Sequence, residues 1–192
     1  AAPAAAQTVE DGFKAYDAGD YETAKSIFLP LAEAGDPRAM NAVGLMFAYG
    51  RGVEFSADTA CDWFERAAEL GHSRAQSNIA SCFEYGRGRP QIASEAVRWA
   101  TFSAEQGNVT AQVALVRLLH LNAPEDARKW GQKAADAGSV PARLMMEKFG
   151  LAYSGARPSR YQKYCFSLKV WLLGKPLNDC DYPTPAATPQ PR

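Results

Sequence analysis

Apolar and polar residues follow one another along the chain with the period of an α-helix, in short runs separated by glycine-containing breaks. In residues 39–47 and again in 60–68, apolar or small side chains recur at steps of three and four residues, which places them on one face of a helix. Gly50 and Gly71 follow these runs, and glycine readily adopts the left-handed conformation that ends a helix. Asp58 is expected to cap the start of the second helix. The pattern predicts a pair of short helices.

This arrangement returns every 36 residues. Without a gap, AMNAVGLMFAYGRGV (39–53) aligns with AQSNIASCFEYGRGR (75–89), and the helical segments that follow them, ADTACDWFERAAELGH and ASEAVRWATFSAEQGN, align in the same way. Two further copies, at 12–36 and 111–139, are shorter in the middle. A repeat of this length is the signature of a stacked array of helix pairs, because one pair cannot bury its apolar face alone.

The sequence therefore predicts an all-α fold, a right-handed α-solenoid of antiparallel helix pairs over residues 8–153, preceded by a flexible N-terminus at 1–7. Small residues are expected where neighbouring helices approach closely, and tryptophans where space between layers must be filled. The small residues are Gly44, Ala68 and Ala80, and the tryptophans are Trp63, Trp99 and Trp130.

The repeat pattern ends after Tyr153. Residues 154–182 contain an apolar and aromatic run whose period fits a helix or a strand. A solenoid needs its last layer covered, so a capping helix is the preferred interpretation. The alternative is a segment that docks a partner through its aromatic side chains, Tyr161, Tyr164, Phe166 and Trp171. The tail at 183–192 is proline-rich and is predicted to be disordered.

At these repeated positions the sequence resembles the Sel-one-like repeat (SLR) family, a relative of the tetratricopeptide repeats. That family's pattern joins A-x-x-x-L-G-x-x-Y-x-x-G-x-G-V to A-x-x-W/Y-x-x-x-A-A-x-x-G. The second copy of the repeat meets it at Ala39, Val43, Gly44, Phe47, Gly50, Gly52, Val53, Ala60, Trp63, Ala67, Ala68 and Gly71. The next copy departs from the pattern at Arg89, where valine is usual, and the last copy departs at Asn122, where the first loop glycine is expected.

The resemblance marks a fold and says little about a specific function. Family members with an export signal and few repeats are often bacterial periplasmic or secreted proteins that act as adaptors, as regulators of membrane signalling proteins or as parts of envelope assemblies. The run of small residues at 1–6 is typical of the residues just after a signal-peptide cleavage site, so a periplasmic or secreted protein is expected. A trimmed chain with a flexible tail is the alternative.

The charge and the hydropathy of the chain argue against two classes of protein, nucleic-acid-binding domains and membrane-spanning proteins. Lys and Arg total 21 and Asp and Glu total 21, so the formal net charge is zero, which argues against a nucleic-acid-binding domain with its usual basic excess. The chain has no apolar run of about 18 residues, so it encodes no membrane span of its own.

Four cysteines suit two disulfides in an oxidising compartment, and four separate buried thiols are the alternative. Antiparallel stacking brings the start of one helix beside the end of another, so Cys61 and Cys82 are predicted to lie at one level of the stack and to join successive repeats. Cys165 and Cys180 would then close the C-terminal segment. The sequence has no Cys-x-x-Cys and only two histidines, so no metal site is predicted.

Motifs of the common enzyme classes are missing from the sequence: there is no G-x-S-x-G, no H-E-x-x-H and no Walker lysine. No lysine has a serine three residues before it, as β-lactam-hydrolysing enzymes require. His72 and His120 have no local nucleophile beside them. We therefore predict no catalytic residue and no cofactor, with an envelope hydrolase as a distant alternative.

By analogy with tetratricopeptide repeats, the first helix of each pair is expected to line a concave face. Residues just beside the packing stripe would then contact a protein partner: Asn41, Leu45, Tyr49, Ser77, Ser81, Glu84, Tyr85, Val113, Arg117 and His120. Tyrosine and arginine are frequent hot spots of interfaces. The alternative is that Tyr49 and Tyr85 pack against neighbouring repeats.

The predicted function is a non-enzymatic protein-binding scaffold, an adaptor or regulator in the bacterial cell envelope. Its partner is expected to be a protein, with a membrane protein or a membrane complex among the candidates. An accessory structural subunit of a larger membrane complex is the alternative.

Overall fold

A computed structural model describes residues 7–153, which fold into nine α-helices and, within that range, no β-strand. The helices are α1 (Val9–Asp17), α2 (Tyr21–Glu33), α3 (Pro37–Tyr49), α4 (Ala57–Glu69), α5 (Ser73–Tyr85), α6 (Ala93–Glu105), α7 (Val109–Leu119), α8 (Pro124–Asp136) and α9 (Val140–Lys148). The predicted capping or docking segment with its four aromatic residues, the Cys165–Cys180 pair and the proline-rich tail lie outside the described residues.

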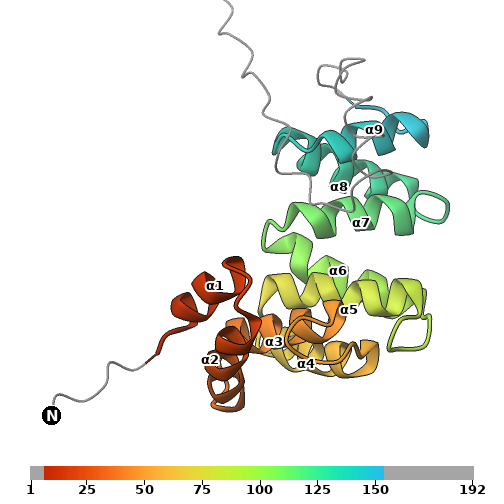
Figure 1. Cartoon of the computed structure of the whole chain (residues 1–192). Helices are drawn as coiled ribbons and strands as arrows, with labels where there is room; N and C mark the ends of the chain where they lie inside the picture. Colours follow the sequence, from red (N-terminus) through yellow and green to blue (C-terminus); the bar gives the residue numbers. More distant parts are fainter. Residues whose placement is uncertain (1–6, 154–192) are drawn as a thin grey trace, which may run out of the picture.

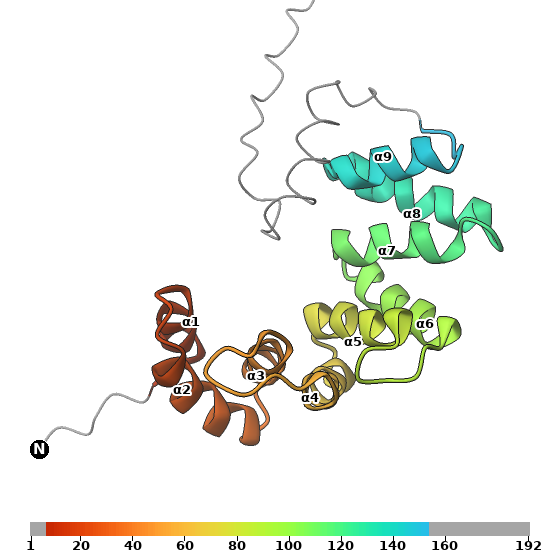
Figure 2. The same cartoon turned by 45° about the vertical axis from the view of Figure 1, so that its right-hand side comes forward.

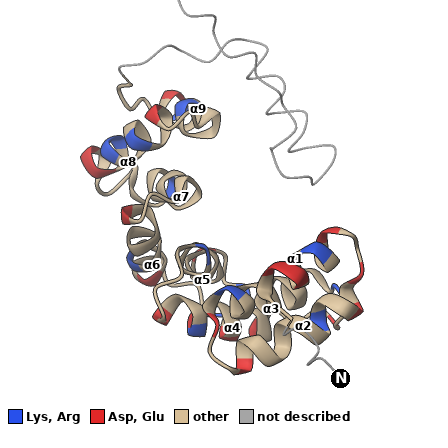
Figure 3. Ribbon diagram, turned by 90° about the vertical axis from the view of Figure 1, so that its left-hand side faces the viewer, with Lys and Arg blue, Asp and Glu red and all other residues tan. Residues whose placement is uncertain are grey.

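The helices stack one after another into a curved array (Figures 1 and 2). Extensive contacts join helices that follow each other in sequence, and α7 also packs on α9. Viewed along the stack, α3, α5, α7 and α9 lie on the inner side of the curve, and α4, α6 and α8 lie on the outer side (Figure 3). The predicted all-α solenoid of helix pairs is confirmed, with the first helix of each pair inside.

Residues 36 positions apart begin the inner helices in the same way. The side chains of Asp36, His72 and Asn108 cap α3, α5 and α7, and each accepts a hydrogen bond from a backbone N–H of the first turn. Such caps satisfy donors that have no partner inside the helix. At the other end, Gly50, which was predicted to end its helix, and Gly86, its counterpart 36 residues later, adopt the left-handed conformation with φ of 63° and 65°.

One predicted cap is wrong. Helix α4 begins at Ala57, and the side chain of Ser56 accepts the hydrogen bond from the backbone N–H of Thr59. Asp58 therefore lies inside the first turn, where its negative charge still favours the N-terminal end of the helix dipole.

The main core extends from α1 to α7 and is built largely from alanine, and a second, small cluster lies at α8 and α9. Ala39, Ala75 and Ala111, one per repeat, are fully buried. Trp99 is buried between layers as predicted, but Trp63 and Trp130 are only half-buried, and the side chains of Arg66 and Lys133 lie over their rings. In α4 the buried ring belongs to the next residue, Phe64, which faces Gly44 of α3.

A disulfide joins Cys61 of α4 to Cys82 of α5, with the two Cα atoms 6.3 Å apart. The bridge thus crosses the boundary between two successive repeats, at the place where the start of one helix meets the end of another. This is the pairing that antiparallel stacking predicts for these two cysteines.

Candidate functional site

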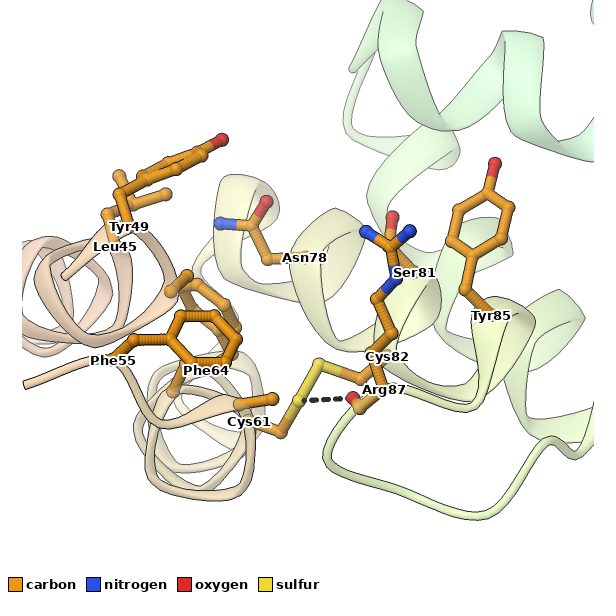
Figure 4. A pocket seen from close by; sticks show the side chains of 13 residues that line it. Leu45, Tyr49, Phe55, Cys61, Phe64, Asn78, Ser81, Cys82, Tyr85 and Arg87 are labelled. Carbon is orange, nitrogen blue, oxygen red and sulfur yellow. Dashed lines mark hydrogen bonds between the residues drawn. A yellow bond between two sulfur atoms is a disulfide. The ribbon is translucent and has the colours of Figure 1, made fainter.

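An open pocket of about 420 Å³ lies between α3 and α5, with α4 below it (Figure 4). Tyr49 and Tyr85 stand on either side of it, and Phe55, from the loop before α4, closes one flank. These rings are 65 %, 50 % and 64 % exposed, respectively. Large aromatic side chains are normally buried in a core. Three exposed aromatic side chains around one pocket therefore provide apolar surface that a ligand can cover.

The base of this pocket is rigid. Phe64 and the Cys61–Cys82 disulfide line it from below, and all three side chains are buried. The carbonyl oxygen of Arg87 lies 3.1 Å from Cys61 Sγ, so the loop after α5 lies directly against the bridge (Figure 4). The pocket is therefore built on elements that are tied together covalently.

A second, more polar pocket of about 480 Å³ continues along α5 toward its start. It shares Leu45 and Asn78 with the first pocket, so the two form one continuous groove along the inner helices. Its polar lining comes mainly from the first half of α5, the start of α7 and the end of α6: Ser73, Arg74, Ser77, Asn78, Gln106, Asn108 and Thr110. We call the two pockets together the inner groove.

Next to the groove, Arg117 of α7 and Glu84 of α5 form an ion pair, with Arg117 Nη2 2.7 Å from Glu84 Oε2. The Glu84 side chain is only 10 % exposed. The same guanidinium lies 5.7 Å from the centre of the Tyr85 ring. Partial burial raises the pKa of Tyr85 above its ordinary value of 10.0.

The structure brings five of the predicted contact residues into the groove as accessible or half-buried side chains: Leu45, Tyr49, Ser77, Ser81 and Tyr85. Asn41 also borders the polar pocket, but its side chain is 4 % exposed, and its Oδ1 accepts a hydrogen bond from Asn78 Nδ2 at 2.9 Å. Asn41 is therefore largely engaged in joining α3 to α5.

Two predicted contact residues are used for packing at the far end of the stack. Val113 packs on a small cluster formed by Ala134, Ala135 and Ala142. His120 stacks on Phe149 with ring centres 3.8 Å apart, and its Nδ1 lies 2.8 Å from the carbonyl oxygen of Arg117. Both side chains hold α7 against the helices that follow it.

Several residues that line the apolar pocket were not among the predicted contact residues, and Phe55, Asn78 and Arg87 are three of them. A signal for Arg87 was present, because Tyr-Gly-Arg-Gly occurs at 49–52 and again at 85–88. In both copies the guanidinium lies near the ring of the tyrosine two residues earlier, at 5.2 Å for Arg51 and 5.9 Å for Arg87. Phe55 has no aromatic counterpart in the next repeat, where Gln91 takes its place.

Other kinds of site are not seen in residues 7–153. No group of three or more His, Cys, Asp or Glu residues in this range is placed to hold a metal ion. None of the helices described there has the length and apolar character needed to cross a membrane.

The family assignment rests on the repeats themselves. The profile of the Sel1 repeat matches residues 37–72, 73–108 and 122–139. The chain carries Sel1 repeats. The first two matches coincide with the α3–α4 and α5–α6 pairs, and the third covers α8 alone. The last Sel1 repeat is thus recognisable only in its second helix, as its departure from the pattern at Asn122 leads one to expect.

Solved structures of Sel1 repeat proteins share this fold. A Sel1 repeat protein from Oxalobacter formigenes superposes with a TM-score of 0.69 at 29 % identity, over 76 % of this chain and 61 % of its own. A protective antigen present in uropathogenic Escherichia coli strains, which displays an SLR fold, gives a TM-score of 0.67 at 24 % identity over 81 % of this chain and 36 % of its own. The chain thus spans less than two thirds of either relative. No curated protein matches its sequence significantly.

Proposed function

We propose that this Sel1 repeat protein is a non-enzymatic scaffold that holds a segment of a partner protein in its inner groove. Sel1 repeats generally mediate protein–protein interactions. The observation that carries the proposal for this chain is the exposure of Tyr49, Phe55 and Tyr85 around an open pocket on a rigid base. Aromatic side chains that bury their surface against a partner supply much of the affinity of an interface.

The setting that we propose is the bacterial cell envelope, where the protein acts as an adaptor or regulator. The disulfide between Cys61 and Cys82 supports an oxidising compartment, since cytosolic thiols are kept reduced. An accessory structural subunit of a larger membrane complex is the second candidate, and the run of aromatic residues between Tyr161 and Trp171 favours it. Purification with a membrane assembly under all growth conditions would favour the subunit over a regulator that binds on demand.

Site-specific photo-crosslinking in the native cell tests the groove. A photoreactive amino acid replaces Ser81, which is exposed and lines the apolar pocket. The matched control replaces Ser94, an exposed serine at the start of α6 that lines neither pocket of the inner groove. We expect a discrete crosslinked partner from position 81 and none from position 94.

The same crosslink must depend on the aromatic rim. With Tyr49 and Tyr85 both changed to Ala, the yield of crosslinked partner from position 81 should fall about tenfold, because each ring contributes roughly 1 kcal/mol or more to such an interface. Circular dichroism checks that the helix content is unchanged. Equal yields from positions 81 and 94, or a yield that survives loss of both rings, would exclude the groove as the binding surface.

A further inference from the structure

Charge is segregated in the middle of the solenoid, although the whole chain is neutral. The inner helices α3, α5 and α7 carry three arginines and one carboxylate, Glu84. The outer helices α4 and α6 carry six carboxylates and two arginines. The segregation is confined to these helices, because α8 carries three charges of each sign and α1 carries three carboxylates and one lysine. A partner that approaches α3, α5 and α7 from the inner side therefore meets an excess of positive charge.

Two arginines of the inner groove have no carboxylate partner in the described part of the chain. Arg38 pairs with Glu10, and Arg117 pairs with Glu84. Arg74, in the polar pocket, and Arg87, at the apolar pocket, form no such pair and are both exposed. These two cations lie at the opposite ends of the groove.

At the Arg74 end, the polar pocket is lined by the first turn of α5, the start of α7 and the end of α6, where Gln106 and Gly107 lie. The partial charges of these helix ends have opposite signs, so the positive charge at this end of the groove comes from the exposed guanidinium of Arg74. At the other end, Arg87 lies near the Tyr85 ring, so its guanidinium is held beside the apolar pocket.

The two arginines also set a length. Arg74 lies in the first turn of α5, and Arg87 follows its last residue by two positions. At 1.5 Å per residue the helix between them is roughly 20 Å long. An extended peptide advances about 3.3 Å per residue, so it covers this distance in about six residues.

We propose that the inner groove selects an extended acidic segment of the partner protein, which deepens the proposed function and rests on it. An apolar side chain of the segment fills the pocket between Tyr49 and Tyr85, and a neighbouring carboxylate pairs with Arg87. A second carboxylate, about six residues along, pairs with Arg74. The apolar anchor supplies affinity, and the two ion pairs supply direction and register.

Binding of short synthetic peptides to the purified chain tests the proposal by fluorescence anisotropy. The probe is a fluorescein-labelled peptide with one phenylalanine, an aspartate next to it and a second aspartate at a spacing that is varied across the series. Matched peptides carry asparagine or lysine in place of both aspartates. We expect the aspartate peptides to bind most tightly, with an optimum spacing of about six residues, and the lysine peptide to bind most weakly.

Substitutions then locate the binding. Arg74→Gln and Arg87→Gln should each weaken binding of the best aspartate peptide about threefold, the effect of one exposed ion pair, and should leave the asparagine peptide unaffected. Arg128→Gln, on the outer helix α8, is the matched control and should change nothing. Added salt should reduce the difference between the aspartate and asparagine peptides.

Three results would overturn the proposal: equal affinity for aspartate and lysine peptides, binding of the aspartate peptide that survives the double change of Arg74 and Arg87, or binding to none of the peptides. Preferential binding of a peptide with the chain's own residues 161–173, or of a short single-stranded oligonucleotide, would assign the groove to another occupant. The crosslink from position 81 separates the two levels of argument. If the Arg74→Gln, Arg87→Gln protein captures the partner from position 81 with undiminished yield, the groove is still the binding surface. That result refutes only the proposal that the bound segment is acidic.

Discussion

Gly44 of α3 lies directly against the ring of Phe64 of α4, so that a Cβ atom built on the glycine would lie 2.5 Å from Phe64 Cε1. One repeat later the same two positions are Ala80 and Ala100, both buried. The two repeats therefore fill the equivalent contact differently. In the first, a large ring packs against a glycine without a side chain, and in the second, two alanines occupy the same two positions.

This size matching predicts a strong dependence between the two positions. Gly44→Ala should lower the free energy of unfolding by about 1–3 kcal/mol, because the added methyl group overpacks the contact. In a Phe64→Ala background the same change should cost little or should stabilise the helix, since both positions then match the next repeat. Urea unfolding of the four proteins of this cycle gives the coupling. Additive effects would show that the ring does not restrict position 44.

The boundaries of the helices were largely predictable, because each depends on local chemistry. Gly50 ends α3 as the sequence predicts, and the repeat carries the same stop to Gly86 at the end of α5. The error at Asp58 arose because serine and aspartate are both good caps and lie two residues apart, so the pattern alone did not identify Ser56. Trp63 and Phe64 are adjacent on α4, and periodicity did not decide which ring faces the neighbouring helix.

The groove was predictable only in part, since its chemistry depends on contacts between residues far apart in sequence. The exposed tyrosines follow from the periodicity of single helices. The engagement of Asn41 by Asn78, 37 residues later, does not, and neither does the stacking of His120 on Phe149. A local pattern states which face of a helix a side chain occupies, but it does not state what occupies the space opposite.

The disulfide between Cys61 and Cys82 should contribute substantially to stability. Its sequence separation of 21 residues corresponds to a chain-entropy effect of about 3 kcal/mol on the unfolded state. The free energy of unfolding of a Cys61→Ala, Cys82→Ala protein should therefore be lower than that of the oxidised parent by about this amount, and the variant should unfold at a lower urea concentration. Reductant acts on every disulfide of the chain, so the double variant, and not reduction alone, isolates this bridge. An unchanged midpoint would contradict this chain-entropy effect.

Acid should weaken the start of α5 through His72. Its Nδ1 accepts a hydrogen bond from the backbone N–H of Ala75 at 3.2 Å, which requires an unprotonated nitrogen. Burial, together with the nearby charges of Arg74 and Arg38, lowers the pKa of His72 in the folded chain below its ordinary value of 6.5. The folded state thus prefers the neutral ring, and the stability that this provides is present above pH 6.5 and is lost as the pH falls through the lowered pKa.

His72→Asn isolates that contribution, because asparagine caps the equivalent helix α7 at Asn108 and does not titrate. Melting temperatures measured between about pH 7.5 and 5 should fall more steeply for the parent than for this variant. The carboxylates common to both proteins cancel in the comparison. Parallel curves would mean that protonation of His72 has no effect on the fold.

Removal of the Arg117 side chain should lower the free energy of unfolding, because it leaves the Glu84 carboxylate without its partner. Arg117→Ala strands the nearly buried carboxylate of Glu84 without its cation, and an unpaired group of this kind costs about 1–3 kcal/mol. Adding Glu84→Gln to the variant should recover part of this loss, since the amide carries no charge. Urea unfolding of the single and double variants measures both steps. A double variant that is less stable than Arg117→Ala would contradict this account.

The order of contacts along the stack has a mechanical consequence. In residues 7–153 every pair of helices with extensive contact is adjacent in sequence, apart from α7 and α9, so the curvature is the sum of small rotations at successive joints. The disulfide between α4 and α5 restrains one of these joints. Opening and tightening of the curve then fall to the other joints, and the joint between α3 and α4 sets the distance between Tyr49 and the restrained pair of helices that carries Tyr85.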